Sequence, residues 1–165
     1  MNKNEPLHLV PKESIPIAQD VPTDDLMSIF RLAAKMEKVC VDGQGIGLSA
    51  VQVGIPWKFF IVQKGRQFEY YVNCVYEGIG DKQKSIEGCL SLRNADGTLK
   101  RYEVLRFEKI KIKGKQLKFS NSPSLILEDV NRTETGLYAV VFQHEIDHSF
   151  NIFISDFGKE IELSQ

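Results

Sequence analysis

Apolar and polar side chains alternate with the period of an amphipathic helix between residues 23 and 39. The apolar positions of this stretch are Leu26, Ile29, Phe30, Ala33 and Met36. Thr23 can cap the N-terminus, and Asp24 and Asp25 then lie in the first turn, where the positive end of the helix favours carboxylates. We therefore expect an N-terminal amphipathic helix that ends before Asp42.

A second helix is predicted to include residues 137–148. Either Thr133 or Thr135 can start it. Residues 137–142 are apolar on every side, which is typical of a helix buried in the middle of a domain. One face of this helix carries four residues at the i, i+4, i+7 and i+11 positions, which are Leu137, Val141, His144 and His148.

Between the two helices the pattern has the shorter period of β-strands. Residues 58–63 and 68–73 are expected to form one hairpin, and residues 102–112 and 116–119 a second one that closes around Gly114-Lys115. In the second hairpin, lysines alternate with isoleucines, so one side of the strand is predicted to be buried and the other solvated. These residues are Lys109, Ile110, Lys111, Ile112 and Lys113.

Strands that separate two helices predict an α+β fold with an antiparallel sheet packed around the second helix. The length of 165 residues suits a single domain that spans residues 1–165. Residues 1–22 are expected to lie extended on the surface because prolines interrupt them at four positions, Pro6, Pro11, Pro16 and Pro22.

The composition narrows the classes of function. A net charge of −1 gives no indication of nucleic-acid binding. The chain has no apolar run long enough to span a membrane, and its N-terminus lacks the hydrophobic region of a signal peptide. Three widely spaced cysteines indicate a reducing compartment rather than a disulfide framework. We therefore expect a cytoplasmic protein without membrane contact.

The second helix contains the sequence H-E-x-x-H. His144 and His148 are four residues apart, so their side chains lie about 40° apart on one helix face and can bind one metal ion. Glu145 can reach a water on that ion without ligating it. The same sequence can also occur by chance on an ordinary, partly buried helix that binds no metal. However, the chain has only three histidines, and the third, His8, lies in a polar segment.

A catalytic ion needs a third protein ligand and an open position. No further histidine follows His148, so the metzincin pattern is absent. Glu160 and Glu162 lie in a short polar tail that is not expected to be well anchored. Cys89 is the better candidate, because Gly88 lets the backbone approach closely and a cation would stabilise the thiolate. Cys40 and Cys74 have no such setting.

Three glycines stand at alternate positions in residues 43–47. A phosphate-binding loop needs a strand before it and a helix after it, whereas here a helix precedes and a strand follows. Nucleotide binding is therefore not expected. The glycines either let a backbone edge approach something extended or simply make a turn.

Three segments together resemble the peptide deformylase family, whose motifs are GφGφAAxQ, EGCφS and QHExDH. The segments are Gly45-Ile46-Gly47-Leu48-Ser49-Ala50-Val51-Gln52, Glu87-Gly88-Cys89-Leu90-Ser91 and Gln143-His144-Glu145-Ile146-Asp147-His148. Two departures stand out. Ser49 replaces the usual alanine, and Ser149-Phe150-Asn151 replaces the usual Leu-x-Gly. The long C-terminal helix of many bacterial members is also missing, as in short relatives that include phage-encoded ones.

The resemblance implies antiparallel β-sheets around a central metal-binding helix that carries H-E-x-x-H. It also implies an Fe²⁺ ion, for which Zn²⁺, Ni²⁺ or Co²⁺ can substitute, with three ligands, Cys89, His144 and His148. Glu145 would act as general base, while the Gln52 side-chain amide and the Leu90 backbone N–H would stabilise the oxyanion. From its place in the sequence alone, Gln52 is equally well explained as a structural loop residue.

The substrate that the resemblance implies is a nascent polypeptide that begins with N-formylmethionine. Its backbone would add as a strand against Ile46-Gly47 and Gly88. Leu137 and Val141 lie on the helix face of His144 and can wall an apolar pocket for the methionine side chain, or they are plain core residues. The resemblance also implies a monomer, and it is compatible with a transient contact with the ribosome.

Three alternatives remain at this point. A metallopeptidase can use the same H-E-x-x-H chemistry on internal peptide bonds, but it would supply a third histidine or an anchored glutamate. A binding protein can hold a structural metal, but that site would be closed by four protein ligands. An inactive relative of the deformylases would keep the motifs without the activity.

Overall fold

The structure is a computed structural model that describes residues 5–162. Its helices are α1 (Leu26–Asp42), α2 (Gly136–Ser149) and α3 (Ile154–Phe157), with two 3₁₀ turns, η1 (Lys12–Ser14) and η2 (Ala50–Val53). Its strands are β1 (Gly47–Ser49), β2 (Phe59–Lys64), β3 (Gln67–Arg93), β4 (Leu99–Phe119), β5 (Leu125–Thr135) and β6 (Lys159–Ile161). Within the described residues, no helix is long and apolar enough to cross a membrane.

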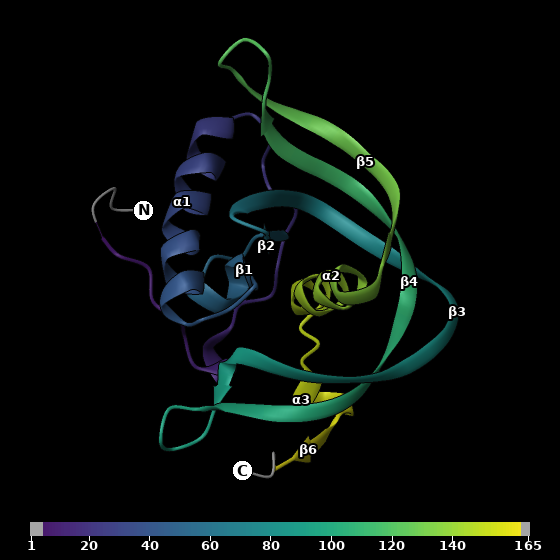
Figure 1. Cartoon of the computed structure of the whole chain (residues 1–165). Coiled ribbons are helices and arrows are strands. Elements are labelled where there is room, and N and C mark those ends of the chain that lie inside the picture. The colour runs from purple at the N-terminus through teal and green to yellow at the C-terminus, as the bar shows by residue number, and fades with distance from the viewer. Residues whose placement is uncertain (1–4, 163–165) are drawn as a thin grey trace.

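The strands form one antiparallel sheet in the order β1-β2-β3-β4-β5, and β6 pairs with β4. Figure 1 shows that β3, β4 and β5 curve around α2, while α1 lies to one side. The predicted α+β fold, with an antiparallel sheet around a central helix and one N-terminal helix, is therefore confirmed. The strands belong to one continuous sheet rather than to several sheets.

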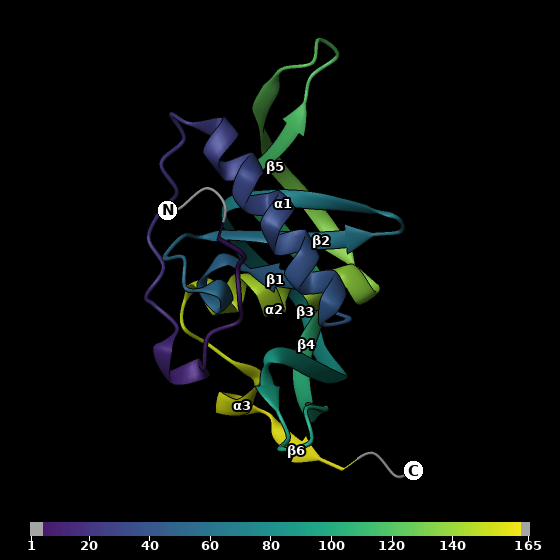
Figure 2. The same ribbon diagram turned by 90° about the vertical axis from the view of Figure 1, so that its left-hand side faces the viewer.

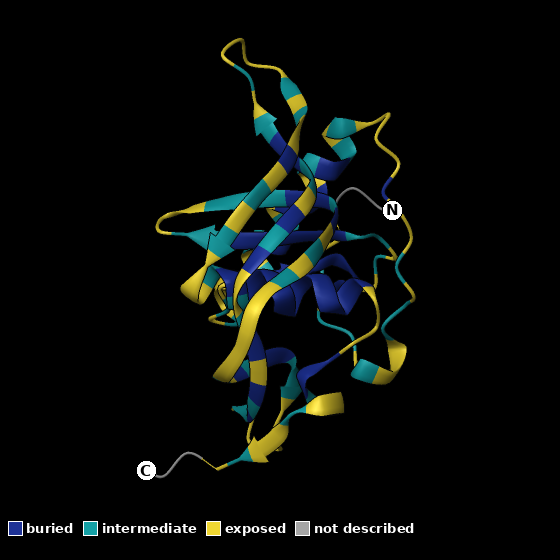
Figure 3. Ribbon diagram, turned by 90° about the vertical axis from the view of Figure 1, so that its right-hand side faces the viewer, coloured by how far each residue is buried: buried dark blue, intermediate teal, exposed yellow. Residues whose placement is uncertain are grey.

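The helix α2 lies in the interior, as its apolar sequence predicted. Phe142 packs edge-on against Phe60 and Tyr71, which project from β2 and β3. A second apolar cluster fills the space between α1 and the sheet. Figure 3 shows α2 as a buried helix behind strands that alternate between buried and exposed positions. On β4, Ile110 and Ile112 are fully buried while the neighbouring lysines face outward, as predicted.

The predicted hairpin around Gly114-Lys115 is wrong. Both residues lie inside the continuous strand β4, and Gly114 is paired with Val130 of β5. A glycine is required there because β3 comes very close, and a Cβ atom on Gly114 would lie 2.7 Å from the Cα of Cys74. The turn comes later, at residues 120–124, which join β4 to β5.

The predicted start of the first helix is also wrong, by a few residues. The helix α1 begins at Leu26, and its N-cap is Asp25 rather than Thr23, because the Asp25 carboxylate accepts a hydrogen bond from the backbone N–H of Ser28. The helix also runs to Asp42 instead of ending before it. Upstream of α1, residues 5–22 form no helix or strand apart from the η1 turn and an isolated bridge between Gln19 and Trp57, and residues 1–4 lie outside the described part.

The end of α2 explains one departure from the resembled family. Asn151 has a φ of 58°, which is the left-handed conformation that commonly follows a helix. Glycine adopts this conformation most easily, and asparagine is the usual substitute. Asn151 can therefore take the place of the glycine in the usual Leu-x-Gly. Its backbone N–H donates a hydrogen bond to the carbonyl of His148.

We predict that the Asn151→Ala substitution lowers the free energy of unfolding by about 1 kcal/mol, because alanine is strained in the left-handed region. Asn151→Gly is the matched control and should leave the free energy of unfolding nearly unchanged. Urea denaturation of both variants measures the difference. Equal stabilities of the alanine and glycine variants would contradict this account of the helix end.

Candidate metal centre

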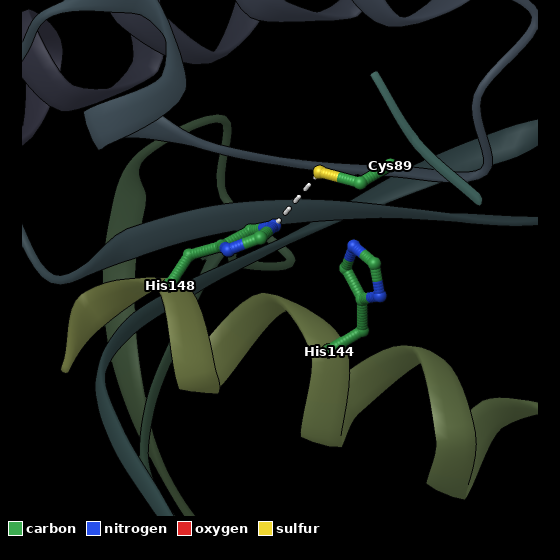
Figure 4. A group of neighbouring side chains, drawn as sticks. All are labelled: Cys89, His144 and His148. Carbon is green, nitrogen blue, oxygen red and sulfur yellow. Dashed lines mark hydrogen bonds between the residues drawn. The ribbon is translucent and has the colours of Figure 1, made fainter. Parts of the chain in front are cut away.

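The structure brings Cys89 of β3 together with His144 and His148 of α2 (Figure 4). The ligand atoms of the three residues lie within 4.8 Å of one another, and all three side chains are buried. The Cys89 Sγ lies 3.5 Å from Nε2 of His148. Two ligands of a tetrahedral cation, at about 2.3 Å for sulfur and about 2.0–2.1 Å for nitrogen, lie roughly 3.6 Å apart. The donor set therefore fits a metal ion.

An irregularity in the sheet places Cys89. The ladder between β3 and β4 pairs Gly88 with Arg101 and next pairs Arg93 with Leu99, so Cys89 falls in a register shift. Such bulges bend a strand and redirect a side chain, here toward α2. The other two cysteines do not belong to this cluster, because Cys40 is buried on α1 and Cys74 is buried on β3. Burial raises the pKa of the Cys40 thiol to about 12 and that of Cys74 to about 11.

A buried network of charged side chains holds His144. The Nδ1 of His144 lies 2.8 Å from the Glu87 carboxylate, which also accepts two hydrogen bonds from Arg106, at 2.9 and 3.1 Å. Arg106 donates a further bond of 2.5 Å to Asp147, and the Tyr76 hydroxyl donates to the same carboxylate. The network leaves Nε2 of His144 free to face the centre, as in metal sites whose histidines are oriented by carboxylates.

The surroundings set the charges of this network. Burial raises the pKa of Glu87, but hydrogen bonds from His144 and Arg106 outweigh burial and lower it to about 2. Burial lowers the pKa of His144, yet interactions with Cys89 and Glu87 raise it to about 10. The pKa of His148 is far below its usual value because of burial and the nearby His144. Metal ligation at His144 therefore displaces a proton.

Glu145 lies beside the three ligand residues without belonging to their cluster. Its Oε2 is buried and has no hydrogen-bond partner among the described residues. Its other oxygen fills the space over Gly47, where a Cβ atom would come within 2.6 Å of it. Burial raises the pKa of the Glu145 carboxyl to about 7. A buried polar atom without a partner is unusual, so Oε2 indicates a place for a bound water or substrate.

Ser49 links Gln52 to the helix that carries Glu145. Its hydroxyl donates a 2.7 Å hydrogen bond to the backbone carbonyl of Glu145 and caps the η2 turn through the N–H of Gln52. The Gln52 amide in turn donates to Ser91, at 3.0 Å, and to the sulfur of Cys89, at 3.4 Å. The sequence pattern gave no indication of these bonds. The bond from Ser49 to the Glu145 carbonyl in particular has no counterpart where the family has its usual alanine, which lacks a hydroxyl.

A cavity of about 310 Å³ reaches the metal centre, where His144 and Glu145 are part of its lining. Its lining includes all the residues that the sequence assigned to substrate binding and to catalysis, which are Ile46, Gly47, Gln52, Gly88, Leu90, Leu137, Val141 and Glu145. Leu137 is 63% exposed, so the first turn of α2 lies at the cavity mouth and is not buried on every side as predicted. Ser85, Ile86, Leu99 and Arg101 also line the cavity, and sequence reasoning missed them because neighbours in the sheet bring them there.

The polar tail is better anchored than the sequence suggested. Residues 159–161 form β6, which pairs with β4. Glu160 accepts a hydrogen bond from Tyr102 and pairs with Lys100, so its carboxylate is engaged away from the histidines. The cluster found among the described residues has cysteine as its third ligand, not a tail glutamate.

Comparisons with known proteins agree on one family. A family model described as polypeptide deformylase matches residues 12–162. A peptide deformylase of Heliobacterium modesticaldum is 35% identical over 130 residues, which cover 78% of this chain and 77% of that protein. One of Hyphomonas neptunium is 31% identical over 132 residues, 76% of this chain and 66% of that longer protein. The crystal structure of a peptide deformylase from Legionella pneumophila superimposes with a TM-score of 0.76 at 25% identity, covering 93% of this chain and 86% of that one.

We predict that Glu87→Gln weakens metal binding by about 10- to 100-fold, because the carboxylate that orients His144 and favours its binding through Nε2 is lost. Competition against a chelator of known affinity measures the change. The control is Glu103→Gln, which alters a glutamate of β4 that pairs with Lys84 at the surface. Unchanged metal affinity in Glu87→Gln would show that the network does not orient His144.

Proposed function

The chain belongs to the polypeptide deformylase family, and on this basis we propose that it removes the N-formyl group from nascent polypeptides that begin with N-formylmethionine, releasing formate. The observation that carries the proposal is the arrangement around the centre, where His144 and Glu145 line the cavity. One thiolate and two imidazoles converge there beside the Oε2 atom of Glu145, which has no partner among the described residues. This set of groups suits hydrolysis of an amide.

We propose Cys89, His144 and His148 as the ligands of an Fe²⁺ ion. A thiolate with two imidazoles also suits Zn²⁺, Ni²⁺ and Co²⁺, so these ions can substitute. When bound, the cation polarises the formyl oxygen and lowers the pKa of a water molecule. Three protein ligands leave one position of a tetrahedral site open for that water, as in other catalytic sites.

Glu145 is proposed to move the proton. Its Oε2 has no hydrogen-bond partner among the described residues, so it can take the proton of the attacking water and then deliver it to the leaving amine. The Gln52 amide and the Leu90 backbone N–H are proposed as donors to the oxyanion. The Oε1 of Gln52 accepts from the backbone N–H of Ser49, and one amide N–H donates to Ser91. The second N–H, which lies by the Cys89 sulfur at the long distance of 3.4 Å, is the one proposed for the oxyanion. Leu90 suits the second role because, like Cys89, it falls in the register shift between β3 and β4.

Two backbone edges of the sheet line the cavity and support the proposed way of binding the peptide. The strand β1 stands at the end of the sheet order, and near Gly88 the described residues that pair with β3 all belong to β4. An extended peptide can therefore add its backbone alongside Ile46-Gly47 and Gly88. Leu137 and Val141 on α2 then meet the methionine side chain.

A metallopeptidase is the alternative that shares the H-E-x-x-H sequence. Such enzymes complete their site with a third histidine or a glutamate, whereas Cys89 occupies that place here. We further propose that the protein acts as a monomer in the cytoplasm, where nascent chains are available through transient contact with the ribosome.

We predict that Glu145→Gln lowers the turnover of formyl-Met-Ala-Ser at least about 100-fold, because the amide cannot take a proton from water. Its metal content should equal that of the unmodified protein, as measured by elemental analysis. Glu108→Gln, at an exposed glutamate bonded to Gln83, is the control and should keep full activity. Loss of the metal in Glu145→Gln would mean that Glu145 is a ligand.

We also predict that formyl-Met peptides are hydrolysed at least about 100-fold faster, in kcat/KM, than acetyl-Met peptides. One added methyl group costs roughly 10- to 200-fold, and a misplaced carbonyl oxygen adds to that cost. Parallel assays of formate and acetate release measure the ratio. Comparable rates for the two peptides, or cleavage at internal bonds, would favour a peptidase.

A further inference from the structure

The two histidines of the centre are held in different ways. His144 is fixed by the deeply buried Glu87, which Arg106 also binds. His148 has no carboxylate partner among the described residues. Its Nδ1 contacts the backbone carbonyl of Ile152, at 3.3 Å, and its ring packs against the ring of Phe153, with 4.7 Å between centroids. The orientation of His148 therefore depends on the short segment that follows α2.

Asp156 is part of what holds this segment in place, together with backbone hydrogen bonds and the buried side chains of Phe153 and Ile154. Phe153 is almost completely buried, and its backbone N–H donates a 2.8 Å hydrogen bond to the Asp156 carboxylate. The helix α3 that follows is a single turn, Ile154–Phe157. Any side chain that holds Asp156 in place thus also holds the residues that contact His148.

Lys12, near the other end of the sequence, is such a side chain. Its Nζ donates hydrogen bonds to the Asp156 carboxylate, at 2.6 Å, and to the Ser155 hydroxyl, at 2.9 Å. The same ammonium lies 5.0 Å from the centroid of the Phe153 ring, which is a cation–π contact. Figure 2 shows η1, which carries Lys12, beside α3. Phe153 thus contacts the ammonium of Lys12 and the imidazole of His148.

We infer that Lys12 is a positioning residue for His148, acting through Asp156 and Phe153 on the metal site. Lys12 does not touch the reacting atoms. It closes the segment after α2 over His148, so that this ring has one preferred orientation toward Cys89. The inference rests on the proposed function only in requiring that a cation binds at Cys89, His144 and His148.

A matched control exists in the same molecule. Lys58 also pairs with an aspartate, Asp20 at 2.8 Å, and also lies over a phenylalanine, Phe150 at 5.6 Å. The side chains of Lys12 and Lys58 are similarly exposed, at 31% and 28%. Phe150, however, is half exposed, and the ring stacked on His148 is that of Phe153. Lys58→Met therefore removes equivalent interactions from the same segment, at Phe150, while the contacts of Phe153 and Asp156 that lead to His148 stay in place.

The test is the rate at which a chelator removes Zn²⁺ from the loaded full-length protein, followed together with thermal unfolding. Lys12→Met should release Zn²⁺ about 10-fold faster than the unmodified protein, as expected when the support of a ligand is lost. Lys58→Met should release it at the unmodified rate, although both substitutions lower the melting temperature to a similar small extent. Lys12→Arg, which keeps the charge, should restore slow release.

A second variant tests whether faster release in Lys12→Met comes from losing the Lys12–Asp156 ion pair rather than from a general loss of stability. Asp156→Asn keeps an acceptor for the Phe153 N–H but removes the charge that holds Lys12, and it should also release Zn²⁺ faster. Equal release rates for Lys12→Met and Lys58→Met, or for Lys12→Met and the unmodified protein, would overturn the inference. Because the readout is release of a cation, a protein that binds Zn²⁺ but does not deformylate peptides would overturn the proposed function and leave this test intact.

Discussion

The bonds that Arg106 makes to Glu87 and Asp147 are the constraint on which the rest of the centre depends. Ionised side chains can stay buried only when each is paired and hydrogen-bonded, and here one guanidinium bridges a carboxylate of the sheet and one of the helix. The bridge fixes α2 against β3, and Glu87 then fixes His144. Removing Arg106 would leave two buried carboxylates without the cation that they share.

Close approach of the backbone is the second constraint. The carboxylate of Glu145 occupies the space over Gly47. The strand β1 and the helix α2 can therefore come this close only because residue 47 is a glycine, which has no side chain. The register shift after Gly88 directs Cys89 to the same place. Ser49 then connects the two sides by bonding to the carbonyl of Glu145. The centre therefore depends on the missing side chain of Gly47 in β1 and on the register shift in β3 as much as on the regular helix.

The sequence predicted the features that depend on periodicity and motif. Spacing and residue type were enough to predict the buried second helix and the lysines on the outer face of β4. They also predicted that Cys89 lies with the two histidines. It did not predict that β4 continues through Gly114, because a glycine needed for close approach to a neighbouring strand looks like a glycine needed for a turn. Nor did it reveal Lys12 over Phe153, since contacts between the two ends of a chain leave no local pattern.

The central claim is that Cys89, His144 and His148 bind one cation and leave one position open. X-ray absorption spectroscopy of the protein loaded with Zn²⁺ tests it most directly. The account predicts one sulfur at about 2.3 Å, two imidazole nitrogens at about 2.0–2.1 Å and one further light atom from water. A first shell without sulfur, or one with four protein ligands, would contradict it.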